Sequence, residues 1–241
     1  NLIKKQNQLL DFLANSIYEN FGDLDVLIGI AEEINDSFFP NLYNSTALLS
    51  KGKWAIVARK IILPTYEVFD EKRYFRSGKN ISSIKKSVSD KEWNIGITIC
   101  EDLWVNQNID GRGIHKKNPI SEFQYENLDL LLNLSASPYT FNKLERRKKV
   151  SLFAARKLKI PLIYINQVGG NDDLIFDGNS FSIDENGKGL NQLKGFEEDS
   201  SCIDLNKKNI NLIQSKPKNN LSSIFEALVL GLKDYTKKCG F

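Results

Sequence analysis

GITICEDLW, at residues 96–104, is an apolar run that ends in a cysteine followed by two carboxylates. The isoleucines that alternate from Ile95 onward predict a strand over residues 94–100. A structural cysteine is usually buried among apolar side chains, whereas Cys100 stands at the edge of this run. Cys100 is therefore either a nucleophile on a strand-to-loop turn or a small residue that fills space, and both interpretations stay open on spacing alone.

The rest of the sequence alternates between strand-like and helix-like segments. Hydrophobic periodicity predicts helices over residues 2–20, 120–127, 143–158 and 223–238, and strands over residues 24–30, 42–49, 54–62, 128–135, 160–168 and 174–183. We expect residues 65–93 to be irregular, residues 106–119 to be a surface loop, and residues 206–220 to be a linker. Ser223 and Glu226 have the spacing of a capping box at the start of the last helix. Several strands are near-continuous apolar runs, which favours a layered α/β architecture.

Composition excludes several classes of protein. The chain has 241 residues, 41% of them hydrophobic and 26% charged, as in ordinary globular proteins. A net charge of +3 argues against a nucleic-acid partner, and the basic run KLERRKK at residues 143–149 is expected to be a solvated helix face, apart from Lys143. Three widely spaced cysteines without a CxxC pair argue against disulfides and a metal site, and favour a cytoplasmic setting. No apolar run reaches the ~18–20 residues that span a bilayer, so no membrane partner is expected.

A cysteine attacks a carbonyl carbon only as its thiolate, so Cys100 needs a base or a cation nearby. His115 is the single histidine, and it is either a dyad partner or a solvated side chain in a polar loop. Lys60 lies late in the strand predicted over residues 54–62. It is either a cation that stabilises a thiolate and an oxyanion, or an edge-strand lysine that points to water.

Five motifs together resemble a known family: LYNSTALL (42–49), KIILPTYEVFDEKRYF (60–75), GITICEDLW (96–104), NLSASPYTFNK (133–143) and YINQVGGNDDLIFDGNSF (164–181). In this order, over residues 24–199, they are similar to the nitrilase superfamily of carbon–nitrogen hydrolases. Within it they resemble the glutamine-hydrolysing domains of glutamine-dependent NAD synthetases. The resemblance implies an α-β-β-α sandwich and a Glu–Lys–Cys triad.

The resemblance also implies catalytic roles. Cys100 matches the nucleophile, and Lys60 matches the triad lysine that stabilises the thiolate and the tetrahedral oxyanion. The backbone N–H of Glu101 would complete the oxyanion hole. Glu71 is either the further glutamate found beside such triads or a surface carboxylate paired with the basic residues that follow it.

Four positions match residues that hold glutamine in this family: Tyr66, Glu101, Ser137 and Lys143. Lys143 stands where an arginine also occurs. The implied reaction releases ammonia from L-glutamine and delivers it to nicotinic acid adenine dinucleotide, yielding NAD. ATP and Mg²⁺ would belong to a separate synthetase domain, and this chain itself would need no cofactor.

The departures from the family pattern lead to further expectations. No FPE motif, which carries the triad glutamate, occurs in the sequence, and no SGGxDS loop follows Phe241. The chain starts at Asn1 and contains no Met. We therefore expect a fragment that lacks the first strand, first helix and second strand of the sandwich. Residues 1–205 would form the hydrolase domain, and residues 206–241 a linker and helix leading to the absent domain.

Such a fragment is expected to be inactive alone, and relatives suggest a homo-oligomer for the intact protein. Two other interpretations remain open. One is a stand-alone nitrilase-type amidase with a different substrate, and the other is a non-catalytic scaffold derived from such an enzyme.

Overall fold

The computed structural model describes residues 2–36, 38–66, 69–88, 90–105, 117–205 and 220–241. They fall into two compact units. Of the described residues, the first unit comprises those within 2–105 and 117–126, and the second comprises those within 127–241. Both units are mixed α/β, as the sequence predicts. Among the described residues, none of the helices is both long enough and apolar enough to span a membrane.

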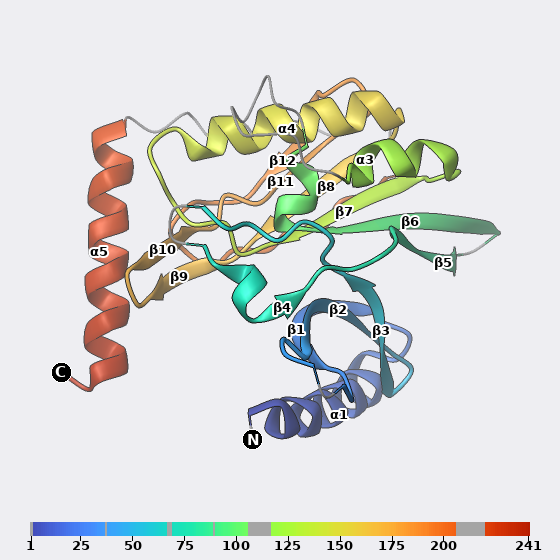
Figure 1. Cartoon of the computed structure of the whole chain (residues 1–241). Coiled ribbons are helices and arrows are strands. Elements are labelled where there is room, and N and C mark those ends of the chain that lie inside the picture. Colours follow the sequence, from blue (N-terminus) through green and yellow to red (C-terminus); the bar gives the residue numbers. More distant parts are fainter. Residues whose placement is uncertain (1, 37, 67–68, 89, 106–116, 206–219) are drawn as a thin grey trace. The chain divides into compact units, whose positions relative to one another are not determined.

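The first unit contains a long helix packed on a small sheet (Figure 1). Its elements here are α1 (Leu2–Phe21), β1 (Val26–Glu33), β2 (Leu42–Ser50), β3 (Lys53–Arg59) and β4 (Phe75–Arg76). The sheet has the order β1-β2-β3 with antiparallel pairs, and β4 pairs with β2 in parallel. Leu10 and Ala14 of α1 form one buried cluster with Ile30, Ala47 and Leu49 of the sheet. The helix predicted over residues 2–20 is therefore confirmed. The apolar stripe that predicts it, Leu2, Leu9, Leu13 and Ile17, is wrong as the buried face, because Leu2, Leu9 and Leu13 are exposed and Leu10 and Ala14 pack on the sheet instead.

Several predicted boundaries in this unit differ from the structure, and two of these differences have a clear physical reason. Residues 65–93 are not wholly irregular, because β5 (Ser82–Val88) pairs antiparallel with β6 (Lys91–Ile99). The sequence SSIKKSV hides this strand, since its half-buried positions include serine and lysine as well as Ile84. The strand predicted over residues 54–62 ends as β3 at Arg59. The N–H of Lys60 still donates to the Asn44 carbonyl in β2, but the N–H groups of Ile61 and Ile62 donate to a side chain instead of a neighbouring strand. Short helical segments complete the unit: η1 (Glu71–Arg73), η2 (Cys100–Leu103), α3 (Pro119–Glu122) and η3 (Phe123–Tyr125).

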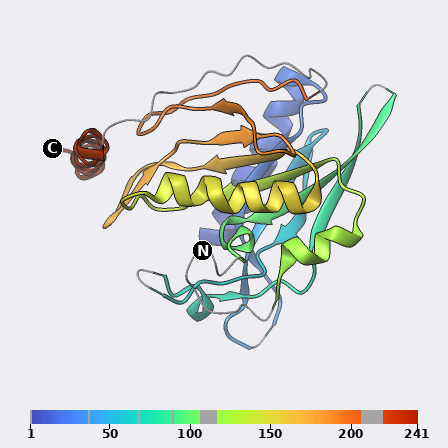
Figure 2. The same ribbon diagram turned by 90° about the horizontal axis from the view of Figure 1, so that it is seen from above.

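The second unit contains a sheet covered by a helix. Its elements are β7 (Leu130–Ser135), α4 (Lys143–Leu158), β8 (Leu162–Asn166), β9 (Val168–Asn171), β10 (Leu174–Asp177), β11 (Phe181–Ile183), β12 (Gly189–Gln192) and α5 (Asn220–Cys239). The strand order is β12-β11-β8-β7, with β7 and β8 parallel and the other pairs antiparallel. The crossover helix α4, yellow in Figure 2, lies along these strands and contacts β8 and β11. Its predicted range, residues 143–158, is confirmed.

The strands predicted over residues 160–168 and 174–183 are each divided in two. The pieces β9 and β10 form a separate hairpin, against which α5 packs. The helix comes very close: a Cβ added at Gly170 would lie 3.3 Å from the Cα of Gly231. Asp234 accepts a hydrogen bond from the Gly170 N–H at 2.6 Å. Because α5 begins at Asn220, Ser223 lies inside the helix, and the predicted capping box is wrong. The predicted linker over residues 206–220 lies almost wholly outside the described residues.

Candidate active site

Cys100 is the first residue after β6 and opens the short helical segment η2. Its backbone φ is +46°, in the left-handed region that non-glycine residues seldom adopt. Such a conformation costs about 1–3 kcal/mol and persists only where the surroundings hold it. Cys100 forms no disulfide, and its side chain is half-buried. Cys100 thus lies on a tight turn at a strand end, which is where a nucleophile is accessible.

Lys60 directly follows β3 and is only 1% exposed, so it does not point to water. Its Nζ lies 2.5 Å from Oε1 of Glu71, a residue of η1. Glu71 therefore pairs with the buried lysine and not with the basic residues beside it. Two of the predicted catalytic side chains are in direct contact, although ten residues separate them along the chain.

The electrostatics of Lys60 link it to Cys100. Burial disfavours the charged form of the lysine, but the negative charges of Cys100 and Glu71 outweigh burial and raise the pKa of Lys60 above its ordinary value. Lys60 is therefore a cation at neutral pH. A buried cation that interacts electrostatically with the cysteine sulfur favours the thiolate over the neutral thiol.

Asp102, to which the sequence assigns no role, is buried beside these groups. Its Oδ1 accepts hydrogen bonds from the backbone N–H groups of Ile61 at 3.0 Å and Ile62 at 2.7 Å. Its Oδ2 accepts from the N–H of Ile99 at 3.1 Å. Burial raises the pKa of Asp102 to about 6, although these N–H groups and the charge of Lys60 act in the opposite direction. The signal in the sequence was a carboxylate two residues after a cysteine that ends an apolar strand.

Two more predicted residues lie in the first unit. Tyr66 is half-buried, and its ring meets that of Phe69 edge-on with centroids 5.7 Å apart. Glu101 is buried in η2, where its carbonyl accepts from the N–H of Trp104 at 2.8 Å. His115, the alternative partner for the thiol, lies outside the described residues. Within the described part of the chain, no group of three or more His, Cys, Asp or Glu side chains could hold a metal ion.

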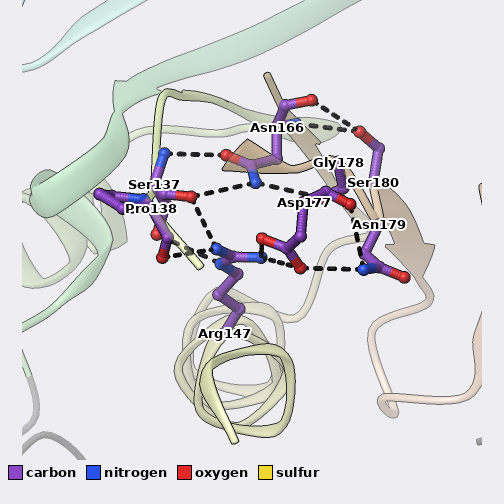
Figure 3. Close-up of polar contacts among 8 residues, drawn as sticks. All are labelled: Ser137, Pro138, Arg147, Asn166, Asp177, Gly178, Asn179 and Ser180. Atoms are coloured by element: carbon purple, nitrogen blue, oxygen red, sulfur yellow. Dashed lines mark hydrogen bonds and ion pairs between the residues drawn. The ribbon is translucent and has the colours of Figure 1, made fainter. Parts of the chain in front are cut away.

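Ser137 and Lys143 belong to the second unit, and both are buried. Ser137 follows β7, and its hydroxyl accepts a hydrogen bond from Nε of Arg147 at 3.2 Å (Figure 3). Nη2 of the same arginine donates to the backbone carbonyls of Ser137 at 2.7 Å and Pro138 at 3.2 Å. Nη1 of Arg147 lies 2.8 Å from Oδ1 of Asp177, the last residue of β10. A fully buried ion pair therefore holds the segment that carries Ser137.

Asn166, at the end of β8, completes this network (Figure 3). Its Oδ1 accepts from the N–H of Ser137 at 2.9 Å, and its Nδ2 donates to the carbonyl of Gly178 at 3.1 Å. The hydroxyl of Ser180 accepts from the backbone N–H of Asn166 at 2.9 Å. Side chains at strand ends thus fix the backbone that follows β7 and β10.

The prediction of a solvated face for KLERRKK is wrong at Arg147, which has no exposed surface. Arg147 lies four residues after Lys143, and Val150 and Ala154 continue the same buried side of α4. Counting helical positions from Lys143 would have identified Arg147 from the sequence. The run therefore contains two buried cations, Lys143 and Arg147, beside basic positions that are exposed or half-buried.

The chain is similar to proteins of known function. The glutamine-dependent NAD(+) synthetase of Synechocystis sp. is 40% identical over 205 residues, covering 83% of this chain and 36% of that protein. The enzyme of the same name from Thermotoga maritima is 31% identical over 255 residues, covering 90% of this chain and 40% of its own length. The chain thus spans somewhat over a third of the curated relatives that it matches. No protein-family model matches the chain.

Solved structures show the same fold. The glutamine-dependent NAD+ synthetase of Acinetobacter baumannii, solved in complex with ADP, is 31% identical and superposes with a TM-score of 0.82. The match covers 100% of this chain and 42% of that one. A carbon-nitrogen hydrolase from Helicobacter pylori G27 superposes with a TM-score of 0.63 at 19% identity, over 81% of this chain and 65% of its own. The fold is therefore that of the carbon–nitrogen hydrolases, as the motifs predict.

Proposed function

Because this chain belongs to the family of glutamine-dependent NAD+ synthetases, we propose that it carries residues that hydrolyse the side-chain amide of glutamine. The observation that supports this most strongly is the buried Lys60, which is ion-paired with Glu71 and whose pKa is raised by the negative charge of Cys100. A cation held in this way favours a cysteine thiolate, which is the attacking species in amide hydrolysis.

The proposed reaction proceeds in two steps. The thiolate of Cys100 attacks the side-chain amide carbon of glutamine, forming an S–C bond and a tetrahedral oxyanion. The charge of Lys60 and the backbone N–H of Glu101 stabilise this oxyanion. The C–N bond then breaks, the nitrogen takes up a proton and leaves as ammonia, and a thioester remains. Water attacks the thioester carbon, the S–C bond breaks, and glutamate is released.

Glu71 is assigned to maintaining Lys60, because its carboxylate is already paired with that lysine. The family resemblance places the base that removes the thiol proton in an FPE motif, and this sequence has no such motif. We therefore assign no residue of this chain to that proton transfer. Lys60 and Glu71 together supply the electrostatic part of catalysis.

Recognition of glutamine is assigned to Tyr66, Glu101, Ser137 and Lys143, on their match to the family motifs. The buried network around Arg147 supports this for Ser137, since a rigid backbone is what a binding site requires. In the whole protein, the ammonia would pass to nicotinic acid adenine dinucleotide in a reaction that uses ATP and Mg²⁺. Those steps belong to parts of the relatives that this chain does not span.

The test is covalent labelling of the full-length protein with the glutamine analogue diazo-oxo-norleucine, followed by intact mass and peptide mapping. We expect one adduct, on the peptide that contains Cys100, and its loss when excess glutamine is present. Cys202 and Cys239 are exposed and free, so they serve as internal controls that must stay unlabelled. Replacement of Lys60 by methionine should slow the labelling strongly.

Three outcomes would reject the proposal. Folded protein without an adduct at Cys100 would indicate the non-catalytic scaffold. Labelling at Cys202 and Cys239 alone would indicate simple alkylation of exposed thiols. Labelling of Cys100 that glutamine does not prevent would indicate an amidase for a different substrate.

A further inference from the structure

A single buried carboxylate joins the two backbone segments that carry the candidate catalytic pair. The two N–H groups that bind Oδ1 of Asp102 belong to Ile61 and Ile62, which directly follow Lys60. The N–H group that binds Oδ2 belongs to Ile99, which directly precedes Cys100. Asp102 is 3% exposed, so these bonds form away from water.

Both segments need such a partner. The chain leaves β3 at Arg59, so the buried N–H groups of the next isoleucines have no strand ladder to join. A buried N–H without a partner destabilises the folded state, and bonds to a carboxylate are stronger than bonds to neutral acceptors. At the other segment, the left-handed φ of Cys100 is retained only if the turn is held on both sides. The bond from Ile99 to Asp102 spans this turn.

The Lys60 backbone is also fixed from elsewhere. Its N–H donates to the carbonyl of Asn44 at 2.8 Å, and its carbonyl accepts from the N–H of Gly78 at 2.7 Å. A Cβ added at Gly78 would lie 2.6 Å from the Arg59 carbonyl oxygen, so the backbone at Gly78 packs closely against the backbone at Arg59. Lys60 is thus anchored to the sheet, and Asp102 connects this anchored segment to the cysteine turn.

We propose that Asp102 is a positioning residue, which sets the distance and orientation between Lys60 and Cys100 without touching the substrate. This inference rests on the glutaminase function proposed above. In this inference, the side chain of Asp102 holds two backbone segments that lie about forty residues apart in the sequence. Displacement of a catalytic group by about 1 Å can reduce a rate by about 100-fold.

The decisive variant is Asp102→Asn in the full-length protein. The amide oxygen of asparagine can still accept from Ile61 and Ile62, but its NH₂ group would face the N–H of Ile99, and two donors cannot bond. The variant therefore keeps the lysine side of the link and breaks the cysteine side. We expect kcat for glutamine hydrolysis to fall about 100-fold with KM changed less than threefold. Asp23→Asn, at an exposed position of the same unit, is the matched control and should leave both constants unchanged.

A second measurement needs no substrate. In a background with Cys202→Ser and Cys239→Ser, the rate of alkylation of Cys100 by iodoacetamide is followed against pH. Asp102→Asn should move the midpoint of this profile to higher pH, because the thiolate loses its well-placed cation while Lys60 and Glu71 are both still present. Loss of the Asp102 charge by itself favours the thiolate and would move the midpoint to lower pH, so a purely structural role would lower stability without any shift to higher pH.

The results separate the two proposals. If wild-type protein fails to react with diazo-oxo-norleucine, the glutaminase assignment fails, but the alkylation profile still tests Asp102. If a folded Asp102→Asn protein keeps the wild-type kcat and alkylation midpoint, the positioning role is rejected. If that variant does not fold, Asp102→Glu keeps both oxygens and changes only their reach. It should fold and lose at least tenfold in kcat, and a wild-type kcat in this variant would reject the inference.

Discussion

Nζ of Lys60 and Oε1 of Glu71 are 2.5 Å apart, and the lysine of this pair is 1% exposed. A lysine is rarely buried to this degree unless it is paired. The pairing keeps it charged, since the negative groups around it raise its pKa in spite of burial. The ion pair is thus the feature of the first unit on which the proposed chemistry depends, and it can be tested directly.

We expect Glu71→Gln to reduce kcat for glutamine hydrolysis by about 100-fold, the lower end of the effect of removing one electrostatic contributor from a site. Without the Glu71 carboxylate, burial would lower the pKa of Lys60. Activity that needs the lysine cation is lost as pH rises through that pKa. The alkaline limb of the kcat/KM profile should therefore move to lower pH in the variant. Glu19→Gln, at an exposed position on α1, is the control. An unmoved alkaline limb would disprove this role for Glu71.

Asp102 should give the protein a pH-dependent stability of a defined sign. Its folded-state pKa is raised from 3.8 to about 6, so the folded protein binds this proton more tightly than the unfolded chain. Stability is then lost as pH rises from about 4 to about 6, by roughly 3 kcal/mol. Asp102→Asn removes this titration, although it also weakens the hydrogen bonds. Thermal unfolding midpoints measured across this range should fall more steeply with pH for the wild type than for the variant. Parallel curves would contradict the assignment.

Removal of Arg147 should destabilise the second unit strongly. Arg147→Met leaves the buried carboxylate of Asp177 without its cation, which typically costs about 3–5 kcal/mol. Arg147→Lys keeps the charge but loses the forked contacts to Ser137 and Pro138, so its cost should be smaller. Lys149→Met, at an exposed position of the same helix, should change stability by less than about 0.5 kcal/mol.

A double variant separates the contribution of the ion pair to stability from the contribution of packing. Arg147→Met combined with Asp177→Leu removes both charges, and it should be more stable than Arg147→Met alone. Chemical unfolding followed by circular dichroism would measure the free energy of unfolding of the double variant and of each single variant. If the double variant were less stable by the sum of the single effects, the pair would not be coupled.

Gly78→Ala should destabilise the first unit, because the new Cβ would lie 2.6 Å from the Arg59 carbonyl oxygen and 3.1 Å from that of Lys60. Both contacts are with backbone, which cannot move aside without disturbing the lysine. Overpacking of this kind costs about 1–3 kcal/mol. Gly29→Ala is the matched control in β1, since nothing lies within 4 Å of its added Cβ. Differential scanning calorimetry should show a lower midpoint for Gly78→Ala only, and equal midpoints would refute this explanation.

The sequence by itself determined the family and much of the fold. The spacing of apolar residues predicted α1 as a helix, although Leu10 and Ala14, and not Leu2, Leu9 or Leu13, form its buried face. The range of α4 was predicted from a charged segment with the length of a helix. The motifs also selected Lys60, Glu71 and Cys100 before any of their contacts were known. Their catalytic roles stay predictions. β5 was missed because its serines and lysines obscure the twofold periodicity that defines a half-buried strand.

Only the tertiary structure decided which polar side chains are internal and what they hold. Asp102 meets Ile61 and Ile62 across about forty residues of sequence, and Arg147 meets Asp177 across thirty. Residue type does not disclose such partners, because most aspartates and arginines are solvated at a surface. Burial is a property of the assembled strands and helices. It is burial that makes one carboxylate a link between two backbones and one arginine of a basic run the support of a neighbouring segment.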